Sequence, residues 1–207
     1  MNEGTSAVII TVTNQKGGVG KTTTTVNLAA SLGVAERKTL ILDLDPQGNA
    51  SSALGIDRSI FAEKNIYHAL MGLVPMSEII VKTEVDNLFV APSNNDLAGA
   101  EIELVSSFAR EYKLKAALAQ IKDSFDYIFI DCPPSLGLLT INALAAADYV
   151  LIPMQAEYLP LRGLAKLTEV IKKIQTRLNS KLKIGGVFLT QYDPRKVLNR
   201  DIGESVE

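Results

Sequence analysis

A glycine-rich segment at residues 14–23, with the sequence NQKGGVGKTT, constrains the fold of this chain more than any other feature. A β-rich run over residues 7–13 precedes it, and residues 22–32 follow it with helical character. Gly33 comes next and is expected to end that helix. A strand, a glycine-rich loop and a helix in this order are typical of a phosphate-binding loop, because the loop amides and the helix N-terminus can face the same anion.

The loop differs from the usual pattern, G-x-x-x-x-G-K-[ST], at its first position. Gly20, Lys21 and Thr22 supply the last three positions, but the first glycine is replaced by Gln15, and an additional lysine, Lys16, follows. The loop amides can still cradle phosphate, the Lys21 ammonium can reach the outer phosphates, and the Thr22 hydroxyl can bind Mg²⁺. A turn that only connects a strand to a helix is the alternative, which the position of Gly-Lys-Thr disfavours.

Two further apolar runs end in carboxylates. Residues 39–42 lead into Asp43 and Asp45, and a continuously apolar run, residues 127–130, leads into Asp131. Because the carboxyl ends of parallel strands meet at one edge of a sheet, we expect these residues to converge on the phosphate loop. Asp131 has the position of a residue that contacts Mg²⁺ directly or through water. Asp43 and Asp45 can divide metal binding and water orientation between them, or only form a turn.

Strands and helices alternate along the rest of the chain. Further strands are predicted over residues 88–91, 149–152 and 184–189, and helices over residues 66–71, 138–146 and 161–178, with one or two more helices in residues 97–121. In this last region Ile102, Val105, Phe108 and Tyr112 share one face. The alternation predicts a single α/β domain over residues 1–207, a mostly parallel twisted sheet with helices on both faces, as in P-loop NTPases. Residues 1–6 are expected to be disordered.

Composition narrows the functional classes. The 207 residues carry a formal net charge of −2, so DNA binding would need a local basic patch. The single cysteine, Cys132, excludes an internal disulfide and a cysteine-rich metal site within one subunit, and is expected to be a small buried residue. The lone His68 is expected to be structural or exposed. Residues 136–153 are interrupted by polar residues and predict a buried helix and strand, not a membrane span. Without a signal-type segment, we expect a cytoplasmic protein.

Taken together, these motifs resemble the ParA/Soj branch of the ParA–MinD family of deviant Walker-type ATPases. The matching segments are residues 16–23 (KGGVGKTT), 43–49 (DLDPQGN), 97–104 (LAGAEIEL), 131–137 (DCPPSLG) and 138–144 (LLTINAL). They extend over almost the whole chain, and their combination is far more specific than a phosphate loop alone. The resemblance implies an ATPase with a deviant Walker A loop and weak intrinsic activity, which uses ATP and Mg²⁺.

The resemblance also implies roles for individual residues. Lys16 is the signature lysine, which in the family's ATP-bound dimer reaches across the interface to the partner's phosphates. Asp45 corresponds to the water-orienting aspartate of switch I, and Asp131 opens switch II. The implied catalytic residues are Lys16, Lys21 and Asp45; the implied ATP-binding residues are Lys16, Gly17, Gly18, Val19, Gly20, Lys21, Thr22 and Thr23; the implied metal ligands are Thr22, Asp131 and, through water, Asp43.

Proteins of this family bind DNA nonspecifically as ATP-bound homodimers, and a ParB/Spo0J-type partner stimulates hydrolysis and releases them. For this chain the resemblance implies a cytoplasmic, nucleoid-associated protein of chromosome or plasmid partition, with no membrane contact. Candidate DNA contacts are the basic residues Lys172, Lys173, Arg195, Lys196 and Arg200. Arg195 matches a DNA-binding position after a late strand of the family, and phosphate contacts need no base readout. A solvated basic face without function is the alternative for each residue taken singly.

Three other functions share parts of this pattern. A MinD-like ATPase that cycles on membranes would need a C-terminal amphipathic helix, whereas residues 201–207 are short and acidic. A metabolic P-loop enzyme, such as a carboxylate-activating synthetase, would need a second substrate site, which the sequence does not identify. An iron–sulfur ATPase of related fold would need more cysteines. Family members continue past about residue 200 with further elements, including a loop that helps to hold the base, and we expect these to be absent or truncated here.

Overall fold

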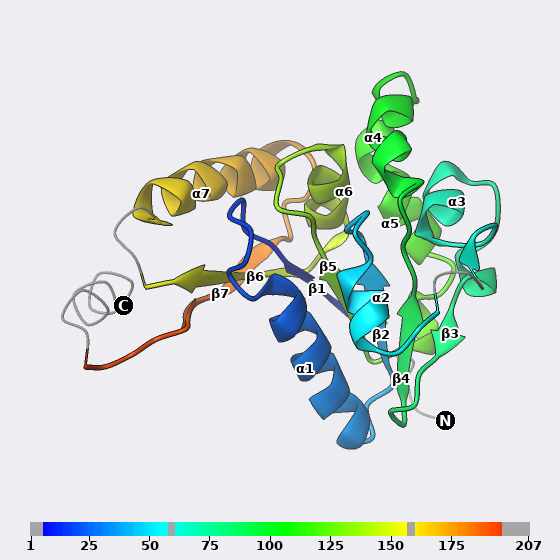
Figure 1. The fold of residues 1–207 in the computed structure, drawn as a ribbon. Helices are drawn as coiled ribbons and strands as arrows, with labels where there is room; N and C mark the ends of the chain where they lie inside the picture. The colour runs from blue at the N-terminus through cyan, green and yellow to red at the C-terminus, as the bar shows by residue number, and fades with distance from the viewer. Residues whose placement is uncertain (1–5, 58–60, 157–159, 196–207) are drawn as a thin grey trace.

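One sheet runs through the molecule, with the strand order β3-β4-β2-β5-β1-β6-β7 (Figure 1). The computed structural model describes residues 6–57, 61–156 and 160–195, with the backbone alone for residues 160–162. Within these residues the strands are β1 (Val8–Val12), β2 (Thr39–Asp43), β3 (Val81–Lys82), β4 (Leu88–Ala91), β5 (Tyr127–Asp131), β6 (Tyr149–Gln155) and β7 (Lys183–Thr190). Neighbouring strands are parallel except β3 and β4, which pair antiparallel.

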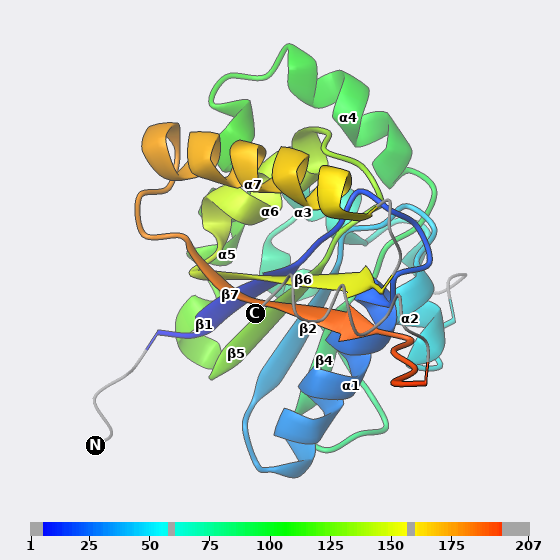
Figure 2. The ribbon, with the colours of Figure 1, turned by 90° about the vertical axis from the view of Figure 1, so that its left-hand side faces the viewer.

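Helices cover both faces of this sheet, so the predicted α/β domain is confirmed. They are α1 (Lys21–Val34), α2 (Asn49–Ala53), α3 (Ile66–Met71), α4 (Leu97–Val105), α5 (Lys113–Leu118), α6 (Leu138–Ala146) and α7 (Pro160–Arg177), with short 3-10 helices η2 (Met76–Glu78), η3 (Arg110–Tyr112) and η4 (Lys122–Ser124). α1 and α2 pack on one face, and α3 to α7 pack on the other. Figure 2 shows α1 and α7 on opposite sides of the sheet.

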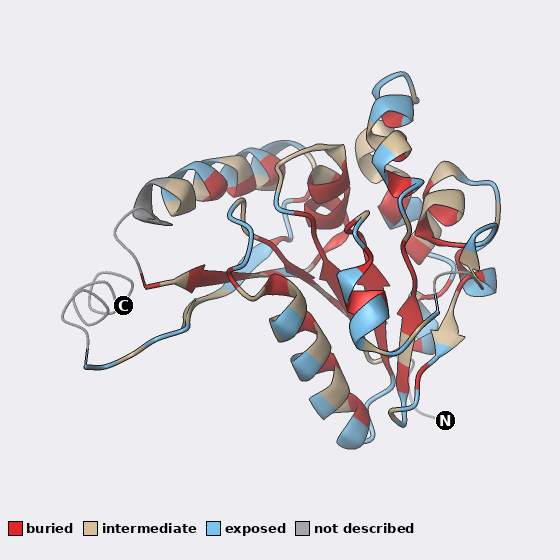
Figure 3. Cartoon of the chain, viewed as in Figure 1, coloured by how far each residue is buried: buried red, intermediate tan, exposed pale blue. Residues whose placement is uncertain are grey.

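The central strands are buried from both sides, as their unbroken apolar sequences require. All five side chains of β2 and four of the five in β5 are buried (Figure 3). The ends of three strands lie level at the carboxyl edge, because the register pairs Asp131 with Val12 on one side and with Asp43 on the other. The loops that follow β1, β2 and β5 therefore meet at one place, as the alternation of strands and helices predicted.

Two local expectations differ from the structure. The two-residue edge strand β3 was not predicted. Gly33 does not end α1, which continues to Val34; a Cβ at position 33 would lie 2.6 Å from the Asp86 carbonyl oxygen. Glycine therefore serves close packing there and not helix termination. The region 97–121 resolves into α4, η3 and α5, and Ala109 before η3 has a left-handed φ of 50°.

Residues 136–153 form α6 and β6 in the interior, as expected. Among the residues that the structure describes, no helix combines the length and apolar character needed to cross a membrane. Several sequence predictions lie outside the described residues: the candidate DNA contacts Lys196 and Arg200, the acidic residues 201–207, and residues 1–5 of the segment expected to be disordered.

Candidate functional site

The phosphate loop joins β1 to α1 at the carboxyl edge of the sheet. Gly18 and Gly20 have φ values of 72° and 89°, which residues with a side chain rarely adopt. Two neighbouring strand ends hold the loop: Gln155 Nε2 donates to the Gly18 carbonyl at 3.1 Å, and Thr190 Oγ1 donates to the Val19 carbonyl at 2.8 Å. Side chains of β6 and β7 therefore fix the conformation of the loop, while Gly18 stays exposed to solvent.

Lys21 begins α1, and its side chain is buried under the loop. Its Nζ donates to the Lys16 carbonyl at 3.1 Å. Burial lowers the pKa of the Lys21 ammonium and outweighs Asp131 and Asp45, which act in the opposite direction. A cation with so little water around it interacts strongly with any anion that the exposed loop binds.

Thr22 and Asp131, the predicted metal ligands, are in direct contact. Thr22 Oγ1 donates to Asp131 Oδ2 at 2.7 Å. Burial raises the pKa of Asp131 to about 7, helped by the charges of Asp43 and Asp45 and opposed by the Thr22 hydrogen bond and by Lys21. A hydroxyl and a carboxylate are the oxygen ligands that suit Mg²⁺. A cation would also compensate the buried negative charge of Asp131.

Asp43 is fully buried at the end of β2, and its carboxylate accepts hydrogen bonds from residues that follow in the chain. Oδ2 accepts hydrogen bonds from the Ser51 amide at 2.8 Å and the Ser51 hydroxyl at 2.6 Å, and Oδ1 accepts one from the Asp45 amide at 3.3 Å. Burial raises the pKa of Asp43 to about 6 in spite of these bonds. Asp43 therefore fixes α2 against β2, a role that the sequence did not predict. Its contact with a metal through water stays a prediction.

Asp45 lies two residues beyond the end of β2 and is also buried. Its Oδ1 accepts a hydrogen bond from the Gln47 amide at 3.0 Å, so one carboxylate oxygen stabilises the turn after β2. Its charge acts on both Lys21 and Asp131, which places it with them at the carboxyl edge. The structure thus brings Asp45 to the site, and its role in orienting water stays a prediction.

Lys16 lies on the exposed rim of the loop, in contrast to the buried Lys21. Its amide donates to Asn14 Oδ1 at 3.1 Å, and its Nζ donates to Gln155 Oε1 at 2.9 Å. The Lys16 side chain is therefore bound at the end of β6. Thr23, the last residue of the predicted ATP-binding set, is exposed in the first turn of α1.

Sequence reasoning missed several residues that shape the site, Thr190 of β7 among them. Gln155 ends β6, a strand whose predicted end was three residues too early; the full strand would have placed Gln155 at the same edge. Thr25 Oγ1 donates to Asp131 at 3.5 Å, and its spacing of three from Thr22 on α1 was a usable signal. Ser51 gave no such signal, because its bond to Asp43 depends on how α2 folds back on β2.

The other predicted residues lie apart from this edge or play no chemical part. Cys132 is buried next to Asp131, and burial raises the pKa of its thiol, in agreement with the expected inert residue. His68 belongs to α3, where its Nδ1 lies 3.3 Å from Asn65 Oδ1, as expected for a structural residue.

The described DNA candidates lie on two exposed segments. Lys172 and Lys173 project from α7, and Lys173 Nζ forms an ion pair with Glu169 at 2.7 Å. Arg195 follows β7, and its guanidinium binds both carboxylate oxygens of Asp193, at 2.9 Å each. The structure therefore pairs two of these three cations with carboxylates on their own segments.

Comparisons with known proteins decide the family. The model of the AAA domain family matches residues 7–184. The chain is 52% identical over 198 residues to the chromosome partitioning protein ParA of Myxococcus xanthus, a match that covers 96% of this chain and 70% of the relative. It is 49% identical over 193 residues to the chromosome-partitioning ATPase Soj of Treponema pallidum, covering 93% of this chain and 75% of the relative. The chain belongs to the ParA/Soj family of partitioning ATPases.

These matches confirm the ParA/Soj family that the sequence predicted. A solved structure confirms the predicted fold. A crystal structure described as cobyrinic acid a,c-diamide synthase from Mycobacterium smegmatis, with bound ADP and magnesium, matches with a TM-score of 0.92 and 42% identity. The match covers 97% of this chain and 81% of that chain. The name of this neighbour belongs to a metabolic enzyme, although its fold matches that of this ParA/Soj chain.

Proposed function

We propose that this chain is a nucleotide-dependent switch of chromosome or plasmid partition. With ATP and Mg²⁺ bound it forms a homodimer that holds DNA nonspecifically, and hydrolysis stimulated by a ParB-type protein releases the DNA. The observation that carries the proposal is the contrast between two lysines of one loop, because Lys21 is buried beneath the loop whereas Lys16 is exposed on its rim. Lys21 can serve its own subunit, and Lys16 is placed to serve another.

The residues of the carboxyl edge fit ATP and Mg²⁺. The exposed loop amides and the N-terminus of α1 would hold the phosphates, and Thr22 and Asp131 would hold the metal, which neutralises phosphate charge when bound. Among the described residues, no three acidic, histidine or cysteine side chains form a metal site of their own. This agrees with Mg²⁺, which proteins usually hold with one or two side chains together with substrate phosphates.

The remaining steps belong to Asp45 and Lys16. Asp45 is buried beside Asp131 and would orient the attacking water with the carboxylate oxygen that the Gln47 bond does not use. Lys16 would leave Gln155 Oε1 to neutralise charge on the phosphates of a second subunit. A single subunit lacks that charge, so we expect weak activity from the monomer and faster hydrolysis from the assembled dimer.

DNA binding is assigned to the exposed cations Lys172, Lys173 and Arg195, together with Lys196 and Arg200 outside the described residues. Contacts to phosphate are sequence-independent, and a dimer would present the basic surface twice. The proposal therefore places the ATP-bound protein on the nucleoid and the released protein in the cytoplasm.

Size-exclusion chromatography and DNA retention test the proposal on three proteins, in ATP and in ADP. The wild type should form a dimer and retain DNA with ATP only, Asp45→Ala should prolong that state, and Lys16→Ala should abolish it. DNA retention that ignores the nucleotide would refute the switch. Binding to liposomes without binding to DNA would instead favour a membrane-cycling ATPase.

The name of the Mycobacterium smegmatis neighbour favours a second candidate, a metabolic synthase that uses ATP to activate a carboxylate. The two candidates differ in what stimulates ATP turnover. Turnover that DNA and a ParB-type protein increase, with no acid substrate present, supports the switch. Turnover that requires cobyrinic acid supports the synthase.

A further inference from the structure

Helix α4 and the turn that follows it present an apolar strip to solvent. Ile102, Val105 and Phe108, called the α4 strip here, are 77%, 60% and 94% exposed. The sequence predicted one helix face that carries these residues and Tyr112, but α4 ends at Val105, Phe108 lies in the following turn and Tyr112 belongs to η3. α4 packs on the protein with its other side, through Leu97, Ala100 and Leu104. Among the described residues, no other stretch of seven positions exposes three large apolar side chains. Single exposed apolar residues are common, whereas a contiguous group indicates a surface that another molecule covers.

α4 lies at the same edge of the sheet as the nucleotide site. It follows the carboxyl end of β4, and both α4 and the loop between β5 and α6 lie toward the top of Figure 1. Residues 97–104 of α4 also form one of the segments that resemble the ParA/Soj family, yet the proposed function gives them no role. A second subunit that receives Lys16 across this edge would approach α4 from the same direction.

Glu101 connects α4 to the segment that begins at Asp131. Its Oε1 accepts a hydrogen bond from the Leu139 amide at 3.4 Å, in the first turn of α6. The carboxylate packs on Gly137, where a Cβ would collide with it. A negative charge at a helix N-terminus is favourable, because the first amides of the helix lack partners. A partner that displaces α4 would therefore move Glu101 and, through it, the loop between Asp131 and α6.

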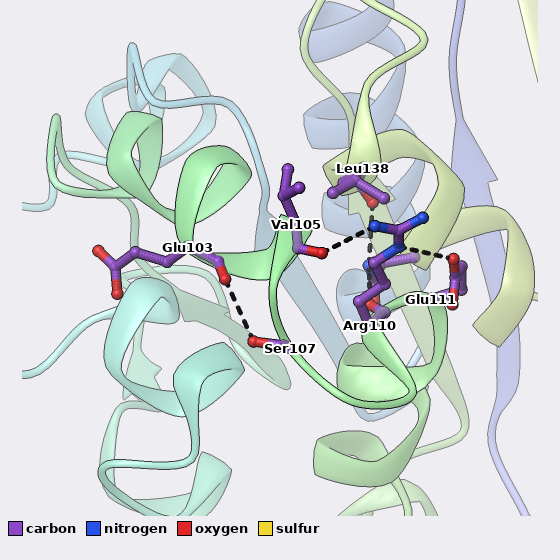
Figure 4. Close-up of polar contacts among 7 residues, drawn as sticks. Glu103, Val105, Ser107, Arg110, Glu111 and Leu138 are labelled. Carbon is purple, nitrogen blue, oxygen red and sulfur yellow. Dashed lines mark hydrogen bonds and ion pairs between the residues drawn. The ribbon is translucent and has the colours of Figure 1, made fainter.

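The turn after α4 is also fixed to the rest of the protein. Arg110 donates through Nη1 to the Val105 carbonyl at 2.8 Å and through Nε to Glu111 Oε1 at 2.9 Å (Figure 4). On α6, Asn142 Nδ2 donates to the Arg110 carbonyl at 2.8 Å. The α4 strip therefore stands on a braced backbone and not on a frayed end. A surface that is ordered before binding loses less entropy when it is covered.

We propose that the α4 strip contacts a second copy of this chain in the ATP-bound dimer, and that Glu101 links this contact to the Asp131 segment. The inference rests on the proposed function. DNA does not fit as the occupant, because residues 97–108, which carry the whole strip, contain two glutamates and no lysine or arginine. In a two-fold dimer the same patch occurs on both subunits, so an apolar strip at the edge that carries Lys16 can meet its own counterpart.

The test is a double substitution, Ile102→Ser with Phe108→Ser, measured by sedimentation with a non-hydrolysable ATP analogue. Both side chains are exposed, so the variant should fold and bind the analogue as the wild type does. Its dimer dissociation constant should rise at least about tenfold, because each lost apolar contact occurs twice in a two-fold interface. Val34→Ser is the control, since Val34 is 75% exposed, close to Ile102, but lies at the far end of α1.

The outcomes separate the inference from the proposed function. A wild type that stays monomeric with the analogue would overturn both. A wild type that dimerises while the double variant dimerises equally well would overturn the inference alone, and loss of the response to a ParB-type protein in that variant would make the strip a partner surface instead.

Glu101→Gln tests the link to the Asp131 segment. This variant should dimerise normally but hydrolyse ATP several-fold more slowly, with a reduced kcat and an unchanged KM. Glu103→Gln is its control, because Glu103 lies on the same helix but accepts from the Tyr67 hydroxyl at 3.1 Å. Equal turnover in the two variants would refute the link.

Discussion

The carboxyl edge of the sheet and the outer face of α7 both carry charged residues, but in opposite settings. At the edge, Lys21, Asp43 and Asp131 are buried, and each is hydrogen-bonded to a loop or helix that meets there. On α7, Lys173 is exposed and pairs with Glu169 four residues earlier. Buried charges are costly unless neighbours compensate them, whereas exposed pairs contribute about 0–1 kcal/mol. Single substitutions should therefore have large, specific effects at the edge and small effects on α7.

The largest effect is expected from Lys21→Ala. Removing a buried cation from a phosphate site should weaken ATP binding at least about 100-fold, because the phosphates then lose a positively charged hydrogen-bond donor. Titration with a fluorescent ATP analogue measures this directly. Lys173→Ala should leave the affinity unchanged, and a comparable loss in both variants would remove the distinction between the two regions.

Ser51→Ala should lower folding stability by about 1.5–3 kcal/mol, the usual contribution of a hydrogen bond to a charged group. The variant removes the 2.6 Å bond to Asp43 and leaves a fully buried carboxylate with fewer donors. Urea unfolding at neutral pH measures the change. Thr176→Ala is the control on α7, where the exposed hydroxyl donates to the Lys172 carbonyl, and its effect should stay within about 0.5 kcal/mol. Similar losses of folding stability in the two variants would show that burial does not determine the size of the effect.

Without nucleotide and Mg²⁺, the protein should be more stable at pH 6 than at pH 8. Burial raises the pKa of Asp43 to about 6 and that of Asp131 to about 7, above the ordinary value of 3.8. The folded state therefore binds these protons more tightly than the unfolded state does. This contribution is fully present below about pH 4 and is lost as the pH rises through 6 to 7.

Thermal unfolding at several pH values measures this effect, which should amount to a few degrees in melting temperature. Asp131→Asn should remove most of the pH dependence, because the amide does not ionise. Glu169→Gln, on the exposed face of α7, should leave it intact. A wild type that melts at the same temperature at pH 6 and pH 8 would contradict the assigned cost of burying these carboxylates.

The sequence predicted the edge better than its surroundings because the edge depends on local patterns. An apolar run that ends in Asp131 locates both a strand and its functional end, and glycines followed by Lys21 locate the loop. The Ser51 bond to Asp43 spans eight residues and depends on how α2 folds back on β2, which no periodic pattern predicts. For residues 102–112 the predicted face was right only in part: Ile102 and Val105 share α4, whereas Phe108 lies in the turn after it and Tyr112 belongs to η3. Periodicity also left the meaning of this face open, since a face that packs on the core and a face that contacts a partner have the same spacing.

The smallest effect is expected on the basic surface, from Arg195→Ala. The guanidinium already binds both oxygens of Asp193, and this pair is exposed, so a DNA phosphate competes with an existing partner. The variant should keep its ATP-dependent dimer and bind DNA slightly less well, and the slope of log affinity against log salt should become less steep by about one. Fluorescence anisotropy over a series of salt concentrations measures both quantities.

Asp193→Asn sharpens this last expectation, because it removes the competing carboxylate and leaves Arg195 in place. DNA affinity should then rise at low salt and converge with that of the wild type at high salt, since the gain is electrostatic. If Arg195→Ala instead abolished DNA retention while the dimer persisted, a single exposed cation would act as specifically as the buried residues of the carboxyl edge. The contrast between the two regions would then lie in what each binds and not in how deeply its charges are buried.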